Sequence, residues 1–81
     1  MPKKLTIQYF ALLREQRGLD QETVQSDAAT AASLYADLAQ EHGFTLPTTA
    51  LKVALNDDFA DWQSPLSDGD TVVFIPPVAG G

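Results

Sequence analysis

The sequence predicts a small α+β domain in which one main helix covers one face of a mixed β-sheet. Strand-like segments precede and follow a single long helical stripe, at residues 31–42, in a chain of only 81 residues. Strands divided by one helix in so short a chain favour a mixed sheet with that helix across one face. The length accommodates one such domain and no more.

The first part of the chain predicts two strands around a short helix. Residues 5–10 alternate between apolar and polar side chains, which is the period of a half-buried strand and puts Phe10 on the polar face. Residues 11–17 favour a short helix. Residues 22–25 are a weaker strand candidate, which we expect to pair back on the first strand.

The main helix is predicted to begin at Ala31 and to end at Gly43. Thr30 is placed to cap it, because its hydroxyl can accept a hydrogen bond from the N–H of Ser33. Phe44 is placed for the apolar contact that often follows a terminating glycine. The apolar stripe of this helix consists of Ala31, Leu34, Tyr35 and Leu38.

The rest of the chain predicts two further strands and a short ambiguous segment. Residues 51–55 alternate as an amphipathic strand, and the turn composition of residues 56–58 follows. Residues 59–63 are either a short edge strand or irregular. After a turn-rich stretch, in which Asp68-Gly69 is the strongest signal, residues 71–75 form the final strand.

The final strand is apolar on both of its faces, which is typical of a central strand covered twice. One main helix can cover only one face, so Val73 and Ile75 need a second cover or stay exposed, together with Phe10, as a patch for a partner. The short helix at residues 11–17 and the segment at residues 59–62 are the candidates for that cover. The sequence leaves both outcomes open.

The composition excludes several classes of function. With five basic residues and a net charge of −6, the chain lacks the basic stripe that nucleic acid requires, and an acidic membrane surface would repel it. The absence of cysteine excludes disulfides, thiolate ligands and cysteine nucleophiles. No run resembles a signal peptide or a membrane span, and we expect a cytoplasmic protein.

The side chains offer little catalytic equipment. Acidic pairs can act as acid and base or bind a hard cation, but those of this chain lie in turns and are better explained as turn formers. They are Asp57, Asp58, Asp68 and Asp70. His42 is the only histidine, and no second ligand candidate clusters with it. Phosphate loops, serine elbows and zinc-protease motifs are missing, so we expect neither a metal site nor a catalytic side chain.

The last residues offer a different chemistry. Pro76 and Pro77 end the final strand and direct the chain outward, because proline has a fixed φ and cannot donate to a β ladder. A carboxylate must be activated before it can carry a group, most simply as an adenylate. An amine then gives an isopeptide, and a sulfur donor gives a thiocarboxylate. The slim tail suited to this chemistry is Val78, Ala79, Gly80 and Gly81.

Residues 65–81, PLSDGDTVVFIPPVAGG, closely resemble the C-terminus of the MoaD family, the small sulfur-carrying subunits of molybdopterin synthase. Residues 9–15 and 53–56 extend the resemblance along the whole chain. The resemblance implies a ubiquitin-like β-grasp domain at residues 1–77 and a flexible Gly-Gly tail at residues 78–81. This family lies within the ThiS/MoaD ubiquitin-like superfamily.

The resemblance also implies a function for the small subunit of a sulfurtransferase. A MoeB-like E1 enzyme would adenylate Gly81 with ATP, and the terminus would become a thiocarboxylate. Gly80 and Gly81 would then enter the active site of a MoaE-like large subunit, within a heterotetramer, and convert cyclic pyranopterin monophosphate to molybdopterin. The chain itself would bind no cofactor. By matched position, the residues that contact the partner would be Phe10, Arg14, Phe59, Ile75, Pro76, Pro77, Val78 and Ala79.

Two other interpretations stay open. A thiazole-pathway sulfur carrier of the ThiS type also ends in Gly-Gly, although such chains tend to be shorter and to lack the two prolines. A ubiquitin-like modifier or binding module would be attached to lysines, or would act by contact alone. The mass of the terminus distinguishes these possibilities, because a carrier exchanges oxygen for sulfur and a modifier forms isopeptides.

Overall fold

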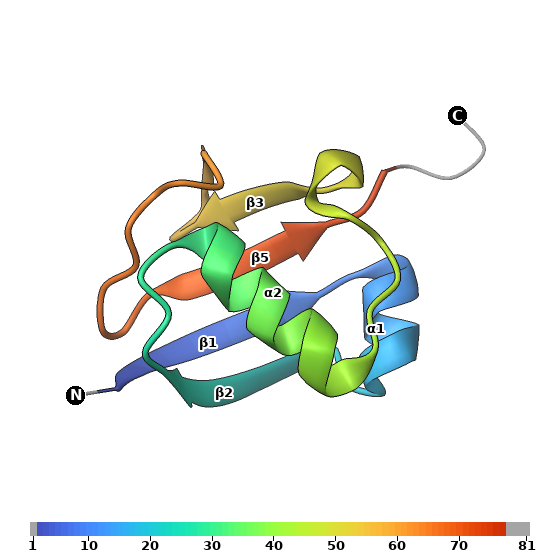
Figure 1. Cartoon of the computed structure of the whole chain (residues 1–81), viewed down its shortest axis with the longest axis horizontal. Coiled ribbons are helices and arrows are strands. Elements are labelled where there is room, and N and C mark those ends of the chain that lie inside the picture. Colours follow the sequence, from blue (N-terminus) through green and yellow to red (C-terminus); the bar gives the residue numbers. More distant parts are fainter. Residues whose placement is uncertain (1, 78–81) are drawn as a thin grey trace.

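The computed structural model describes residues 2–77 of the chain, which form one mixed sheet with a helix across it (Figure 1). The strand order is β2-β1-β5-β3-β4, and α2 lies over one face of the sheet. The elements are β1 (Lys3–Tyr9), α1 (Ala11–Arg17), β2 (Gln21–Ser26), α2 (Ala31–His42), the 3₁₀ turn η1 (Thr48–Ala50), β3 (Lys52–Leu55), β4 (Asp58–Ala60) and β5 (Thr71–Ile75). The predicted α+β fold with one main helix is confirmed.

Strand β5 occupies the centre of the sheet, as its two apolar faces predicted. It pairs parallel with β1, from Thr6 opposite Thr71 to Tyr9 opposite Phe74. On its other side it pairs antiparallel with β3. The last strand of the chain therefore lies between two others, and parallel strands are typically the buried ones.

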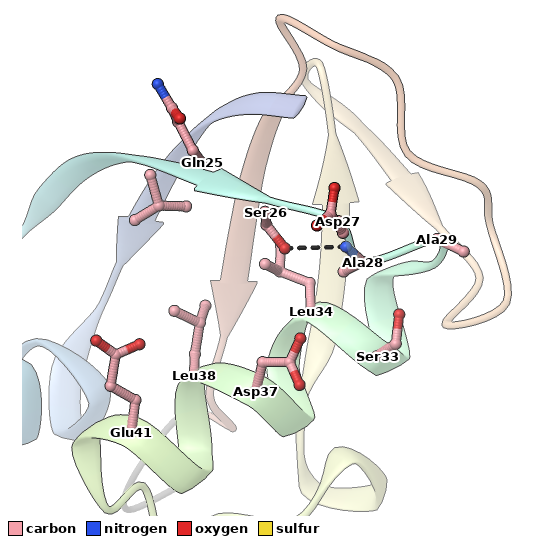
Figure 2. A pocket seen from close by; sticks show the side chains of 11 residues that line it. Gln25, Ser26, Asp27, Ala28, Ala29, Ser33, Leu34, Asp37, Leu38 and Glu41 are labelled. Carbon is pink, nitrogen blue, oxygen red and sulfur yellow. Dashed lines mark hydrogen bonds between the residues drawn. The ribbon is translucent and has the colours of Figure 1, made fainter. Parts of the chain in front are cut away.

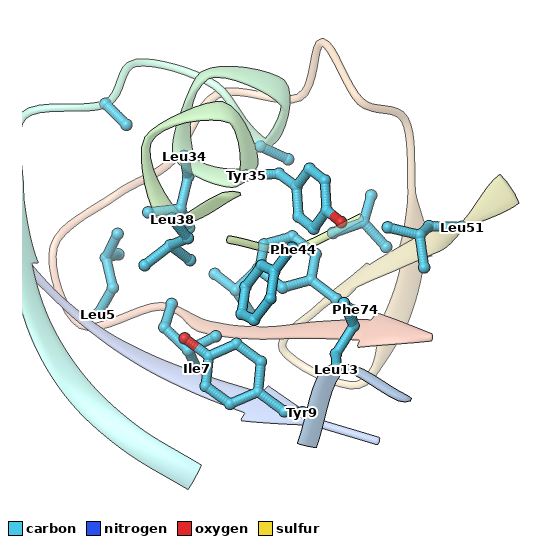
Figure 3. Packing of buried hydrophobic residues seen from close by; sticks show 14 of the residues in the cluster. Leu5, Ile7, Tyr9, Leu13, Leu34, Tyr35, Leu38, Phe44, Leu51 and Phe74 are labelled. Carbon is cyan, nitrogen blue, oxygen red and sulfur yellow. The ribbon is translucent and has the colours of Figure 1, made fainter. Parts of the chain in front are cut away.

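The hydrophobic core lies between α2 and the facing side of the sheet, which we call the inner face (Figure 3). Alternate residues of β1 supply Leu5, Ile7 and Tyr9, each at most 1% exposed. The predicted helical stripe is buried in full, as is Phe74 from β5. Tyr35 contacts the ring of Phe74 edge-on, at 5.1 Å between centroids. Apolar side chains that recur every two residues along the strands and every 3.6 residues along the helix thus pack together in one cluster.

Helix α2 begins and ends as the sequence predicts. The Thr30 hydroxyl accepts from the Ser33 N–H at 3.2 Å, and the Ser33 hydroxyl accepts from the Thr30 N–H at 3.1 Å. This reciprocal pair satisfies two N–H groups at the helix start. Gly43 ends the helix at φ 76°, and Phe44 beyond it is buried and stacks on Tyr35 at 5.9 Å.

Several boundaries differ from the predicted ones. Strand β1 starts at Lys3 and ends at Tyr9, which leaves Phe10 at the start of α1 rather than within the strand. Strand β2 is six residues long instead of four, because its whole length pairs with β1. The η1 turn was not predicted, and Leu51 precedes β3 instead of opening it. The ambiguous segment after Asp57 does form a short edge strand, β4.

The acidic turn residues have structural roles. Asp68 Oδ1 accepts from the Lys4 N–H at 2.6 Å, and Asp70 Oδ2 accepts from the Ser67 N–H at 2.8 Å. Asn56 and Asp57, with φ values of 51° and 76°, form the tight turn between β3 and β4. The interpretation of Asp57, Asp68 and Asp70 as turn formers is confirmed, whereas for Asp58 it is wrong, because Asp58 is the first residue of β4 and pairs with Leu55. Within residues 2–77, neither helix is long and apolar enough to cross a membrane.

Removing side-chain volume from the core should destabilise the domain far more than the same change outside it. Leu34, on α2, is 1% exposed, whereas Leu19, in the connector after α1, is 42% exposed. We expect Leu34→Ala to lower the free energy of unfolding by about 2–5 kcal/mol. Leu19→Ala should change it by less than about 0.5 kcal/mol. Urea unfolding followed by circular dichroism measures both, and equal losses would contradict the assigned core.

Candidate functional site

The parallel strands β1 and β5 end at the same edge of the sheet, and the candidate site is built there. Tyr9 and Phe74 lie opposite each other near the ends of the two strands. The chain continues from β1 into α1, and from β5 into Pro76 and Pro77, which we call the tail root. Segments far apart in the sequence, α1 and the tail root, are therefore brought together (Figure 1).

A sharp backbone turn lets α1 begin directly after β1. Phe10 is extended, with φ −127° and ψ 153°, and Ala11 then adopts a left-handed φ of 52°. For a residue with a Cβ this conformation costs about 1–2 kcal/mol. Strained residues of this kind gather at functional sites. The turn places the first residues of α1 against the tail root.

Two hollows flank the tail root. One has a volume of about 430 Å³ and lies between α1 and the connector after α2; it is lined by Ala11, Leu12, Arg14, Glu15, Leu46, Pro76 and Pro77. The other has a volume of about 270 Å³ and is lined by Thr49, Ala50, Leu51, Lys52, Ile75, Pro76 and Pro77. Arg14, Ile75 and both prolines, expected at the docking site, are thus brought together.

The connector after α2 supplies residues to both hollows, and the sequence did not indicate them. Leu46 borders one hollow, and Thr49 and Ala50 border the other. The Tyr35 hydroxyl donates to the Leu46 carbonyl at 2.6 Å, which holds the connector against α2. No local pattern in residues 45–50 indicates this contact. The connector is placed by long-range hydrogen bonds, this one and those between the Gln16 side chain of α1 and Thr45.

The sheet face away from α2, which we call the outer face, carries the predicted apolar docking residues. Phe59 lies opposite Ala54, which lies opposite Val73, so the three share this face. Ile75, two residues after Val73, follows on the same side. Phe10 is still extended and continues the alternation of β1. It is 47% exposed, and Phe59 is 74% exposed.

Neither candidate cover lies over the outer face. Leu13 of α1 is fully buried in the core cluster, and Trp62 packs against the same cluster. The Trp62 ring stacks on Phe74 at 5.9 Å and meets Tyr35 at 5.8 Å, both on the inner side. Val73 and Ala54 lie outside that cluster although they are nearly buried. The short helix and the aromatic segment therefore complete the core instead of covering Val73 and Ile75.

The tail itself, Val78, Ala79, Gly80 and Gly81, lies outside the described residues. The division into a domain at residues 1–77 and a tail at residues 78–81 therefore stays a prediction. What the structure places is the tail root, at the end of the central strand and between two hollows.

Comparison with known proteins identifies the family. The ThiS family matches residues 7–81, nearly the whole chain. The chain belongs to the ThiS family. A molybdopterin synthase sulfur carrier subunit of Haemophilus influenzae is 35% identical to this ThiS-family chain over 80 residues, which cover 95% of the chain and 99% of the relative. The resemblance to these carrier subunits is thereby confirmed.

Solved structures confirm the fold of this ThiS-family chain. SAMP1 from Haloferax volcanii superposes with a TM-score of 0.80 at 25% identity, over 96% of this chain and 99% of that one. A ubiquitin from Caldiarchaeum subterraneum, 16% identical over the full length of both chains, superposes with a TM-score of 0.66. The ubiquitin-like β-grasp fold is therefore confirmed.

One solved relative comes from a complex. It belongs to a protein–protein complex of subunits 1 and 2 of molybdopterin-converting factor from Helicobacter pylori. The match has a TM-score of 0.66 at 26% identity and covers 96% of this ThiS-family chain and 99% of that one.

The carboxylate of Glu22, in β2, has a structural role in this ThiS-family chain. Glu22 accepts two hydrogen bonds from Arg17, each 2.8 Å, and one from the Tyr9 hydroxyl at 2.6 Å. The Arg17 guanidinium holds the pKa of the Glu22 carboxyl below its usual range. Burial, with Glu22 beside it, raises the pKa of Tyr9 far above its ordinary value. His42 Nε2 lies 4.0 Å from Glu22 Oε2, and its ring packs near Phe44. The one histidine therefore joins Tyr9, Arg17 and Glu22 in what we call the Glu22 cluster.

The Glu22 cluster should make the domain sensitive to acid. Because the pKa of Glu22 is lower in the folded chain than in the unfolded chain, its ionised form stabilises the fold. This contribution is complete above the ordinary glutamate pKa of about 4.3, and it is lost as the pH falls through the lowered pKa of the folded state. At pH 7 we expect Glu22→Gln to lower the free energy of unfolding by about 1–3 kcal/mol, because the bonds lose their charge. The variant should also lose less stability than the wild type between about pH 5 and pH 2.

Urea titrations at several pH values measure this difference. Glu41→Gln is the matched control, because Glu41 is exposed on α2 and should leave both quantities nearly unchanged. Parallel pH profiles for the wild type and Glu22→Gln would refute the assigned role of Glu22.

Proposed function

We propose that this chain is the sulfur carrier subunit of a molybdopterin synthase in molybdenum cofactor biosynthesis. The observation that carries the proposal is the full-length relation, at 35% identity, to a molybdopterin synthase sulfur carrier subunit. The sequence adds a Gly80-Gly81 end, and the geometry adds a tail root held at the end of the central strand. The chain acts as part of an enzyme, and its own side chains perform no chemistry.

The reacting group in this proposal is the Gly81 carboxylate. A MoeB-like E1 enzyme couples it to AMP from ATP, with pyrophosphate as the leaving group. A sulfur donor then displaces AMP and leaves a thiocarboxylate. Within the large subunit the thiocarboxylate sulfur forms a bond to a side-chain carbon of cyclic pyranopterin monophosphate as an oxygen substituent leaves that carbon. Water then cleaves the resulting thioester, which leaves the sulfur on the pterin and releases the Gly81 carboxylate. Two such deliveries supply both sulfurs of the molybdopterin dithiolene.

A MoaE-like large subunit is the partner that the outer face would meet. Phe10, Phe59 and Ile75 offer it apolar contact, and burial of exposed aromatic side chains is a principal source of affinity at interfaces. Arg14 borders the hollow beside the tail root, where it can fix the approach of the tail. The complex of subunits 1 and 2 from Helicobacter pylori supports a partner of this kind. We further propose the heterotetramer, with two large subunits at its centre, and a cytoplasmic location.

Intact mass of the protein recovered from its own cells tests the carrier function. During active cofactor synthesis we expect a fraction of the chain to carry sulfur in place of one oxygen at Gly81. Isopeptide conjugates without any thiocarboxylate would instead support the ubiquitin-like modifier. Capture of a thiazole synthase, rather than a MoaE-like subunit, would support the ThiS-type carrier.

Deletion of Gly81 should separate chemistry from folding. The truncated chain should lose sulfur transfer entirely, because its terminal carboxylate is one residue too short for the partner's active site. Its melting temperature should stay within about 1 °C of the full chain, since terminal residues contribute little packing. Molybdopterin synthesis with purified subunits gives the first quantity and calorimetry the second. Unfolding upon deletion would show that the tail is structural and would defeat the proposal.

A charge placed on the outer face should weaken binding to the large subunit. Ile75→Asp would bury an unpaired carboxylate in the interface, and we expect the affinity to fall by at least about tenfold to a hundredfold. Ala36→Asp is the control, because Ala36 is exposed on α2, which lies over the opposite face of the sheet, and it should leave affinity unchanged. Calorimetric titration of the two subunits measures both. Equal affinities for Ile75→Asp and the wild type would remove Ile75 from the interface.

A further inference from the structure

The two edges of the sheet differ, and the difference points to a second docking surface. Strand β4, at one edge, has only three residues, and short edge strands offer little to pair with. Strand β2, at the other edge, has six residues, with neither proline nor lysine among them. Its one charged residue, Glu22, is bound by Arg17 and Tyr9 and so does not protect the edge.

The register shows which backbone groups of β2 face outward. The Tyr9 N–H donates to the Asp20 carbonyl at 2.9 Å, and hydrogen-bonded pairs alternate along an antiparallel ladder. The even-numbered residues of β2 therefore face β1, and Gln21, Thr23 and Gln25 direct their N–H and C=O groups away from the sheet. Among the described residues, no loop or cap bonds to these outward groups.

A groove of about 610 Å³ runs between this edge and α2 (Figure 2). Val24, Leu34 and Leu38 form its apolar floor, and Asp37 and Glu41 project from α2 along one side. A strand added to β2 would lie about 4.8 Å beyond it. Those of its side chains that share a face with Val24 would point into the groove.

The charge around the groove indicates its occupant. Three exposed carboxylates border it, those of Asp27, Asp37 and Glu41, and within residues 2–77 no basic side chain lines it. Lys3 and Lys4 lie opposite the groove residues Ser26 and Gln25, and the Lys3 ammonium donates to the Ala28 carbonyl at 3.2 Å, at the loop end of the groove. We propose that β2 and this groove bind an extended segment of a partner protein that has apolar residues at alternate positions and a lysine or arginine at each end of that alternating set.

This surface lies at the β2 edge of the sheet, which β1 separates from the strand that carries the tail root, and its loop end is at the opposite end of the strands from that root. Ser26, at the loop end of the groove, pairs with Lys3 at the start of β1. The tail root instead follows the end of β5, where Phe74 lies opposite Tyr9 at the end of β1. A partner on β2 could therefore remain bound while the tail is engaged elsewhere. The inference does not depend on the sulfur-carrier proposal, and its test does not use Gly81.

A seven-residue probe tests the surface directly: acetyl-Lys-Thr-Val-Thr-Ile-Thr-Arg-amide, with both basic and both apolar residues on one strand face. Titration into the whole ¹⁵N-labelled chain should give saturable amide shifts at residues 21–27 and along α2. Added salt should weaken the binding, because the carboxylates are exposed. The control peptide, acetyl-Thr-Lys-Val-Thr-Ile-Arg-Thr-amide, has the same composition with its basic residues on the other face and should bind several-fold more weakly.

Three variants separate the contribution of the strand edge to binding from that of the charges. Thr23→Pro removes one outward N–H without touching the ladder to β1, and it should abolish binding of the probe. Glu41→Lys should weaken binding about fivefold to tenfold, whereas Asp58→Lys, the same charge change on β4, should not. Both charge variants alter exposed residues, so they keep the test valid even if Thr23→Pro fails to fold.

The proposal is overturned if the probe fails to saturate, or if its shifts gather around Arg14 and Ile75 instead. It is equally overturned if Glu41→Lys and Asp58→Lys bind alike, or if the two peptides bind alike. A second copy of this chain would present the same carboxylates and should be repelled. Sedimentation should therefore show a monomer, and a dimer that Thr23→Pro dissolves would assign the edge to self-association instead.

Discussion

The pairing of β5 between β1 and β3 is the constraint on which the rest of the structure depends. Because the last strand of the chain is the central one, the tail root leaves from a strand held on both sides. Within the five residues of β5, Val72 and Phe74 point into the core, and Val73 and Ile75 lie on the outer face. One short strand therefore contributes to the core, to the outer face and to the tail root together. A carrier that reacts at its end gains from this, since a fixed root reduces the conformational freedom lost when the tail enters another active site.

A single main helix has consequences for both sides of the sheet. Helix α2 covers the inner face, and the remaining apolar side chains that might have covered the other face, Leu13 and Trp62, complete the core instead. The outer face is left with small, tightly packed side chains in the middle and exposed aromatic residues at its margins, Phe10 and Phe59. Neither exposed aromatic residue contributes to the core, and in the proposed complex both would contact the large subunit.

Local patterns in the sequence predicted the elements that local physics controls. Alternation placed Leu5, Ile7 and Tyr9 in the core, and the Thr30 cap and Gly43 fixed both ends of α2. The site was predicted only in part. Phe10, Ile75 and the prolines follow from strand parity and the tail, whereas Phe59 came only from the family resemblance. The hollows were not predicted, because they depend on Ala11 turning left-handed and on Tyr35 holding the connector at Leu46. The Glu22 cluster was likewise missed, since it joins four elements and no local spacing indicates it.

The exposed edges of the sheet follow from the same central placement of β5. With the first and last strands paired at the centre, β2 and β4 are left at the margins. All six residues of β2 pair with β1, and in the part of the chain that the structure describes this antiparallel ladder is the only sheet contact of β2. An edge of that length exposes outward N–H groups unless a charge or a proline protects it, and the one inward charge is already bound by Arg17. The acidic residues of α2 beside the groove then become the protection, because they disfavour pairing with another acidic copy of the chain and favour a basic strand. Selection against self-association and selection for a basic partner are thus two effects of one charge pattern.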